Sequence, residues 1–298
     1  MSEGLPAPAG AIYDRGYRHY DGIREGRSRL VKALVLAGVR RTLGLKRSWR
    51  TKVVPWGLLV IAFAPVVAFI GVRVVAGDTV QELIGYDRYL GIVSVVLLLF
   101  SATAGPELLC PDRQSSVLAL YFTRPLSRAD YLLAKATALV LVMALIALLP
   151  LVVLFLGNAV TAPRAVDYLG DHLADVGRIL LTGSVLTIFY SSVALAVASL
   201  SERRSIATGV LIGIFLVSNV VVSIVVFTTD FAGRRWLTLL ALPNLVERFV
   251  DWVFGEPVAP GSIAAEAGFS GPVYLVALLV ATALAGALVS WRISRLRA

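Results

Sequence analysis

The chain has 298 residues, of which 58% are hydrophobic and only 16% are charged, and its formal net charge is +9. A soluble globular domain is about half apolar and about a quarter charged, so this composition fits neither a soluble domain nor a disordered chain. The single cysteine, Cys110, excludes an intramolecular disulfide. The two histidines, His19 and His172, cannot form an ordinary structural zinc site without carboxylates, and no metal site is predicted.

Residues 1–52 carry too many charges to cross a membrane and are interpreted as an N-terminal segment of their own. Within it, residues 27–52 are predicted to form a helix lying along the membrane interface, with Arg29, Arg40 and Arg47 on a basic stripe and leucines broadly opposite. Arg41 breaks this pattern, so the helix is only moderately amphipathic. A basic interfacial helix of this kind anchors to anionic membrane lipids.

Six apolar blocks follow, each long enough to cross a bilayer, which needs about 20 residues per helix. They cover residues 53–72, 89–105, 131–157, 179–200, 206–227 and 272–291. We therefore predict an all-α, polytopic membrane protein in which residues 53–298 form a six-span transmembrane domain.

Basic residues predict the orientation of these spans. One side of the predicted membrane carries 21 of the 28 Lys and Arg residues, and the other carries seven. The basic side is expected to face the cytoplasm. Both termini are then cytoplasmic, as an even number of spans requires. Membrane topology accounts for the positive charge, so no nucleic-acid partner is predicted.

The predicted spans contain no ionisable side chain near their midpoints. Arg73 lies just beyond the first span and Lys135 one turn into the third, and both are expected to extend toward the interfaces. Ion-coupled carriers usually keep titratable groups at mid-membrane, so that class is disfavoured. A nucleotide-binding motif of the G-x-x-x-x-G-K-[ST] kind is also absent. The chain is therefore not predicted to be an enzyme or to bind a cofactor, and uphill transport requires energy from a partner.

The connection between the second and third spans, residues 107–135, is the most informative polar segment. Asp112 is predicted to cap a short helix that runs to residue 122. Pro125 ends that helix, and Ser127 with Asp130 forms a capping box directly before the third span. The resulting elbow is expected to expose Asp112, Arg113, Arg124, Arg128 and Asp130. A solvated connector and a docking element for a partner both remain possible.

Two further connections have distinct lengths. Residues 201–205 form a tight turn that makes the fourth and fifth spans antiparallel neighbours. Residues 228–271, between the fifth and sixth spans, contain an apolar stretch at residues 236–254 that is interpreted as two short helices, and the rest of the loop, with Pro257, Pro260 and Gly261, is expected to be a flexible connector. These helices either dip into the outer leaflet or lie on it.

Small residues at four-residue spacing occur in two spans. Gly209 and Gly213 lie in the fifth, and Ala194 and Ala198 in the fourth. Such pairs allow close helix contact, which we expect within the chain, with a dimer seam as the alternative. Asn219 is the most polar group in a predicted span and either faces a cavity or bonds a neighbouring helix.

The order of these features resembles the ABC-2-type transporter permeases, the membrane subunits of ABC exporters. Arg113 is followed by Leu118 and then by residues 123–135, TRPLSRADYLLAK. This is similar to the family's S/T-R-P-hydrophobic-S-R…K signature. The resemblance implies an N-terminal interfacial helix, six spans, a coupling helix between the second and third spans, and short re-entrant helices before the sixth.

The resemblance also implies the function. The chain would be the permease subunit of an ABC exporter in the bacterial inner membrane, paired with a second permease chain that is identical or paralogous. Two separate ABC ATPase chains would bind ATP and Mg. The residues implied to couple to the ATPase are Asp112, Arg113, Ser116, Leu120, Arg124, Arg128, Asp130, Glu202, Arg203 and Arg204. Gly209, Gly213 and Asn219 are the candidates for the translocation path or dimer seam.

An alternative function uses the same elbow without a continuous pathway. The chain would then be a non-transporting membrane scaffold, or a mechanotransmitting permease that acts on partner proteins. For the exporter, the absence of charge in the predicted spans gives uncharged path walls, which favours an amphipathic or lipid-like substrate.

Overall fold

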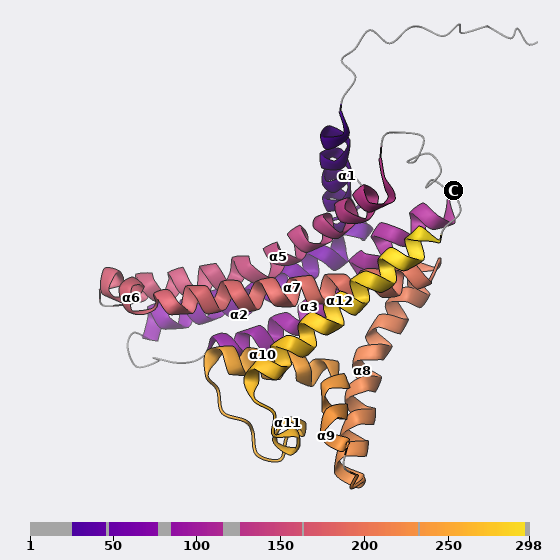
Figure 1. Ribbon diagram of the computed structural model, residues 1–298. Coiled ribbons are helices and arrows are strands. Elements are labelled where there is room, and N and C mark those ends of the chain that lie inside the picture. Colours follow the sequence, from indigo (N-terminus) through magenta and orange to yellow (C-terminus); the bar gives the residue numbers. More distant parts are fainter. Residues whose placement is uncertain are drawn as a thin grey trace, which may run out of the picture.

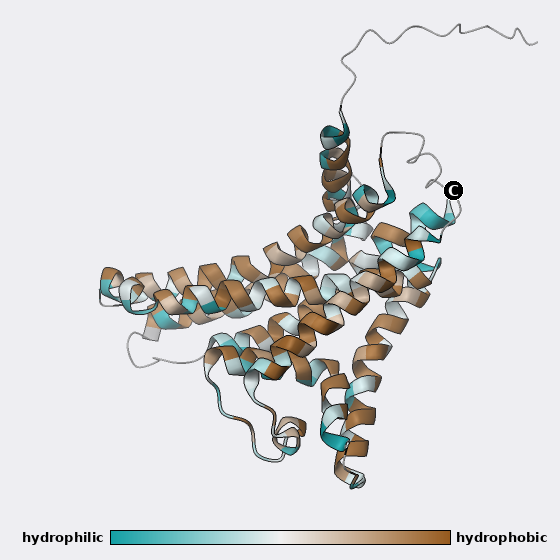
Figure 2. Ribbon diagram, viewed as in Figure 1, coloured by the Kyte–Doolittle hydropathy of each residue, from teal (hydrophilic) through white to brown (hydrophobic). Residues whose placement is uncertain are grey.

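The computed structural model describes residues 26–45, 48–76, 85–115, 126–162, 164–231 and 233–295. All regular secondary structure in these ranges is helical, and six of the helices are long and apolar enough to cross a membrane (Figure 1). These are α2 (Trp49–Ala76), α3 (Tyr86–Gln114), α5 (Arg128–Thr161), α7 (Leu173–Leu200), α8 (Arg204–Thr228) and α12 (Gly271–Ser294). The predicted all-α, six-span membrane protein is confirmed, and Figure 2 shows hydrophobic residues along the spans and hydrophilic ones near their ends.

Helices α3 and α7 form the centre of the bundle. They pack on each other, and α7 also packs on α5 and α12. The side chains between them are large and fully buried, as Leu97, Phe100 and Phe189 show. Helices α2, α8 and α12 expose most of their apolar surface, and α8 diverges from the other spans (Figure 1). Since exposed apolar surface suits lipid or another membrane helix, the bundle has its core on one side and α8 at its margin.

Small residues bring the two central helices close together. A Cβ atom on Gly105 would lie 2.9 Å from the Cβ of Ala194 and 3.2 Å from that residue's carbonyl oxygen. The expected close contact of the fourth span is therefore confirmed at Ala194. The expectation for the fifth span is wrong, because a Cβ added at Gly209 or Gly213 meets no atom of the described residues within 4 Å. Those two glycines of α8 face open space.

The N-terminal helix is shorter than the sequence predicted. Helix α1 (Arg27–Thr42) ends in a turn at Gly44, whose φ of +66° is left-handed and suits glycine, and α2 begins at Trp49. The predicted continuation to residue 52 is wrong for this reason. Helix α1 packs mainly against α5, and a Cβ on Gly38 would lie 2.6 Å from the Cβ of Ala138. Part of the apolar face of α1 thus contacts protein.

Helix α3 continues beyond its predicted end at residue 105. It runs through Pro106 and Pro111 to Gln114, and Ser115 is its C-cap. Asp112 consequently lies in the last turn of a long helix, so the prediction that Asp112 starts a new helix is wrong. The remainder of that predicted helix, residues 116–122, lies outside the described residues.

The connection between α8 and α12 folds into short helices, as predicted for residues 236–254, whereas the helix at residues 263–267 was not predicted. They are α9 (Arg234–Leu237), the 3₁₀ turn η2 (Thr238–Leu240), α10 (Leu242–Phe254) and α11 (Ile263–Ala267). Near the start of α10, Val246 lines the same cavity as Tyr190 and Phe215, which lie near the middles of α7 and α8. At the other end, the ring of Phe254 stacks on Tyr86, at the start of α3, with centroids 5.9 Å apart. Helix α10 therefore runs beside the spans, which favours the re-entrant alternative over a helix lying flat on the leaflet.

The remaining short helix, α6 (Ala165–Asp171), joins α5 to α7 and was not predicted. It carries no buried residue, so no apolar periodicity marks it in the sequence.

Replacing Gly105 with leucine tests the close contact of α3 and α7. We expect a loss of about 1–3 kcal/mol, because the added side chain is forced against the backbone of Ala194. Gly57→Leu on α2 is the matched control, since a Cβ there meets no described atom within 4 Å. Thermal unfolding in detergent, followed by circular dichroism, measures both. Equal melting temperatures for the two variants would contradict the packing.

Candidate coupling site at the α1 end of the bundle

One end of the bundle, here named the α1 end, gathers charged side chains from five helices. It comprises α1, the last turns of α3 and α7, and the first turns of α5 and α8. Six side chains form what we call the carboxylate network. They are Arg41, Glu107, Asp112, Tyr131, Lys135 and Arg204.

Asp112 is the centre of this network and is only 5% exposed. Its Oδ1 accepts a hydrogen bond from Arg41 at 2.9 Å. Its Oδ2 accepts one from the Tyr131 hydroxyl at 2.9 Å and lies 2.7 Å from Lys135 Nζ. A buried carboxylate without partners costs several kcal/mol, so these three partners are a condition for burying it. Through one side chain, α3 is joined to both α1 and α5.

Helical spacing explains why the partners converge. Tyr131 and Lys135 are four residues apart and lie on one face of α5. Leu108 and Asp112 have the same spacing on α3, and Lys135 Nζ also donates to the Leu108 carbonyl at 3.2 Å. Lys135 is 4% exposed. The expectation that Lys135 extends to the interface is therefore wrong, because its ammonium group is held inside by an anion and a carbonyl.

Glu107 extends the network to α8. Its Oε1 lies 3.4 Å from Nε of Arg41, and its Oε2 is paired with Arg204. Arg41 thus bridges both carboxylates of α3, which explains why it breaks the amphipathic pattern of α1. It lies on the protein-facing side because its partners are there.

Arg113 binds the end of α7. Its guanidinium donates to the carbonyl oxygens of Ser199 at 2.5 Å and Ser201 at 3.3 Å, and lies 3.7 Å from the carboxylate of Glu202. The last carbonyls of a helix have no partner within the helix, so an arginine there satisfies them. The expectation that Asp112 and Arg113 are exposed on an elbow is wrong, because both are used for contacts between helices.

The start of α5 is fixed by contacts nearer the surface. The predicted capping box of Ser127 and Asp130 is confirmed. Asp130 also accepts two hydrogen bonds of 2.8 Å from Arg27 of α1, and these bonds, together with the charge of Asp130, raise the pKa of that guanidinium. Arg128 donates to the carbonyl of Ser294 at 2.6 Å, which joins α5 to the end of α12. Exposed pairs contribute little stability, so these contacts mainly fix position.

The residues implied to couple to an ATPase thus divide into groups. Asp112 and Arg113 are internal. Those on the surface or partly on it are Arg128, Asp130, Glu202, Arg203 and Arg204. Those outside the described residues are Ser116, Leu120 and Arg124. The described members all lie at the α1 end, so the fold brings the two predicted contact segments to one face.

The candidates for a path or dimer seam lie elsewhere, along α8. Asn219 is partly exposed, and no hydrogen bond joins its amide to another described side chain. With Gly209 and Gly213 facing open space, this stripe of α8 is not packed against the described part of the chain.

Six apolar spans, of which α3, α5 and α8 are joined at one end by the carboxylate network, define a multi-pass helical membrane protein with a polar end. A family model described as ABC-2 family transporter protein matches residues 72–295, and the chain belongs to this family. It is therefore a permease subunit of an ABC transporter, a class without ATPase motifs of its own that works with ABC ATPase partners. A search of curated proteins found no match.

Sequence reasoning missed Arg41, Glu107 and Tyr131 as members of the site. Arg41 left a signal, since it was the residue that broke the helical pattern of α1. Glu107 left a weaker one, as an acidic residue directly after an apolar span. Neither signal identifies the partner residue, because the partners are up to 97 residues away in sequence.

A double-mutant cycle tests the buried ion pair. We expect Lys135→Met to lower the free energy of unfolding by about 3–5 kcal/mol, since it leaves a buried carboxylate with too few partners. Asp112→Leu combined with Lys135→Met should cost less than the sum of the two single changes. Arg178→Met, which removes a half-exposed arginine paired with Asp175, is the control and should cost less than about 1 kcal/mol. Denaturant unfolding in detergent measures all four variants, and strict additivity would contradict the coupling.

Proposed function

We propose that the chain is the permease subunit of an ABC exporter in the bacterial inner membrane. Its α1 end and both termini face the cytoplasm, where two separate ABC ATPase chains, which hold ATP and Mg, dock on it. The permease acts as a dimer with an identical or paralogous chain. The family match and the excess of basic residues on the proposed cytoplasmic side support this assignment.

The carboxylate network is the observation that carries the coupling role. Asp112 and Glu107 connect α3 to α1, α5 and α8, and Arg113 adds the end of α7. Breaking a buried ion pair is costly, so these helix ends resist separation. A displacement imposed on this surface by an ATPase is therefore transmitted to several spans as one rigid shift.

The exposed part of the α1 end gives the docking surface. Arg203 is exposed in the turn between α7 and α8, beside Glu202, whose side chain is 68% exposed. Arg128 lies on the same end, at the start of α5. We expect this surface to meet an acidic patch on the ATPase, since complementary charge steers and orients association.

The dimer seam is assigned to α8. A polar amide such as Asn219 in a hydrocarbon environment requires a hydrogen-bond partner. The open glycines Gly209 and Gly213 allow a second helix to approach α8 closely. A second permease chain packed along α8 supplies both the partner for the amide and the cover for the apolar face.

Charge reversal of Arg203 tests the docking surface. We expect Arg203→Glu to reduce the amount of ABC ATPase that co-purifies with the tagged permease to less than about a third of wild type. Arg164→Glu, whose side chain is 84% exposed on the far side of the bundle, should leave recovery unchanged. Quantitative mass spectrometry of gently purified complexes provides the measurement. Wild-type permease that brings no protein with a nucleotide-binding motif overturns the proposed function, and unchanged recovery with Arg203→Glu overturns the docking surface.

Bulky substitutions on α8 test the seam. Gly213→Leu and Asn219→Leu should each lower the fraction of permease dimers in lipid nanodiscs, because one blocks close approach and the other removes the hydrogen bond. Gly286→Leu on α12 is the matched control, since that glycine also faces open space. Counting subunits by single-molecule photobleaching measures the dimer fraction. A dimer fraction that falls only with the α12 variant would place the seam there.

A further inference from the structure

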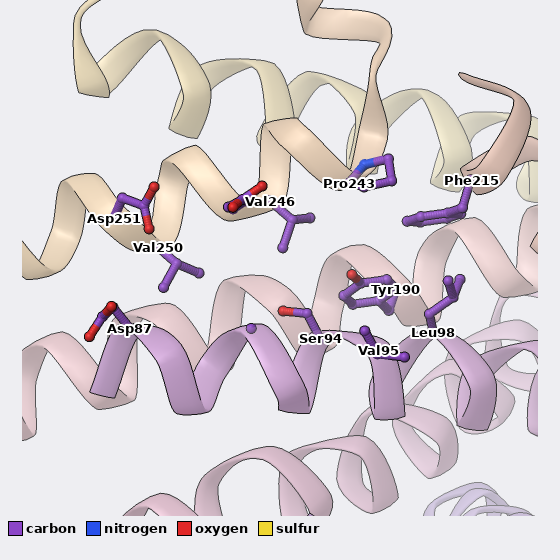
Figure 3. Close-up of a pocket in the computed structure, with 12 residues that line it drawn as sticks. Asp87, Ser94, Val95, Leu98, Tyr190, Phe215, Pro243, Val246, Val250 and Asp251 are labelled. Atoms are coloured by element: carbon purple, nitrogen blue, oxygen red, sulfur yellow. The ribbon is translucent and has the colours of Figure 1, made fainter. Parts of the chain in front are cut away.

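A cavity of about 270 Å³ lies between α3, α7, α8 and α10 (Figure 3). Its inner part is apolar and aromatic. The rings of Tyr190 and Phe215 stack there with centroids 5.4 Å apart, and Leu98 lies beside them. Helix α10 covers this part with Pro243 and Val246. The cavity therefore has an apolar floor formed by spans and a cover formed by the re-entrant helix.

The other part of the cavity is acidic. Asp87 of α3 and Asp251 of α10 lie at that end in Figure 3, and Glu247 also lines the cavity. Glu247 and Asp87 are close enough to Asp251 for their charges to repel it. Asp251 is compensated by Arg248 at 3.2 Å, whereas no ion pair joins Asp87 or Glu247 to another described residue. The mouth thus carries more negative than positive charge.

A second cavity lies next to this mouth. It has a volume of about 450 Å³, and Asp87 lines both cavities. Its walls are polar and aromatic and carry charges of both signs, from Arg73, Arg88, Arg178, Asp87, Asp175 and Glu256. The two cavities thus share Asp87 as a wall residue.

We propose that the cavity between α3 and α10 binds an amphipathic cation. The apolar group of this ligand lies against the rings of Tyr190 and Phe215, where stacking and cation–π attraction also favour a positive charge nearby. The positive group lies beside Asp87, Glu247 and Asp251. This replaces the expectation of uncharged walls, because re-entrant α10 brings two carboxylates that do not belong to any span. The assignment of such a cation as transported cargo rests on the proposed function, but its binding does not.

The side chains that line the cavity disfavour three other classes of ligand. An anionic amphiphile would meet three carboxylates at the mouth. Among the described residues no group of three or more His, Cys, Asp and Glu side chains is placed to hold a metal ion, so a bare cation has no coordinating site. A neutral lipid tail would fit the floor but leaves the carboxylates without a counter-charge.

Photo-crosslinking in nanodiscs, without any ATPase, tests the site. The probe is benzophenone carrying a trimethylammonium group, and its twin carries a sulfonate instead. We expect the cationic probe to label residues of α3 and α10 at the cavity, as located by mass spectrometry, and the anionic twin to label them at least tenfold less. Equal labelling by the two probes, or labelling only at lipid-exposed faces, overturns the proposal.

Two pairs of variants separate the site from surface effects. Asp87→Asn combined with Glu247→Gln should reduce cationic labelling at least fivefold, whereas Asp230→Asn, on an exposed loop after α8, should not. Gly91→Phe should abolish labelling by filling the cavity, since Gly91 lines it and a Cβ there meets no described atom within 4 Å. Gly286→Phe on α12 is its control. Labelling that persists in Gly91→Phe overturns the site, even if the carboxylate variants fail to fold.

The proposed function is tested separately. Stimulation of ATP hydrolysis by the cationic probe in a reconstituted permease–ATPase complex would make the cation a substrate. Site-specific labelling without co-purifying ATPase would keep the binding site and reject the exporter. A functional ATPase complex without labelling would keep the exporter and reject the binding site.

Discussion

The buried carboxylate of Asp112 is the constraint on which the α1 end depends. An ionised side chain that is 5% exposed is tolerated only when cations and donors surround it. Here these come from α1 and α5, so α1 must lie across the bundle at the height where Arg41 reaches α3. The same requirement holds Lys135 inside the protein and positions the first turns of α5. One charge thereby fixes the relative positions of three helices.

This constraint changes what counts as the transmembrane domain. The family match begins at residue 72, inside α2, and the sequence suggested a boundary at residue 52. Neither boundary follows the packing, because Arg41 supplies bonds to both Glu107 and Asp112. Helix α1 also has its own close contact with α5, at Gly38. A chain truncated before α2 would leave two carboxylates of α3 short of a cation, so α1 belongs to the folded unit.

The sequence predicts those structural features that depend on a local pattern of residues. The six spans follow from apolar length, and the capping box at Ser127 follows from a three-residue spacing. It does not predict the partners of Asp112, which come from segments brought together only by folding. The open face at Gly209 is a similar case, because small residues permit close packing but do not say which helix is near. The carboxylates of α10 were not predicted to line a binding site, because they lie in a connection between spans, where charged residues are common.

The carboxylates at the two ends of the bundle differ in how completely they are paired with cations. This difference indicates which of them serve the fold and which are available to a ligand. At the α1 end each buried carboxylate has cations within 3.4 Å, so its charge is paired within the protein. At the cavity beside α10, the cation nearest to Asp251 is Arg248, whose side chain is mostly buried and shared with no other described carboxylate. Asp87 and Glu247 have no ion-pair partner among the described residues, although Asp87 lies in the first turn of α3, where a negative charge suits the helix dipole. Uncompensated charge beside an apolar cavity stabilises a bound cation more than it stabilises the empty protein, which is why the cavity, and not the network, is where a ligand is expected.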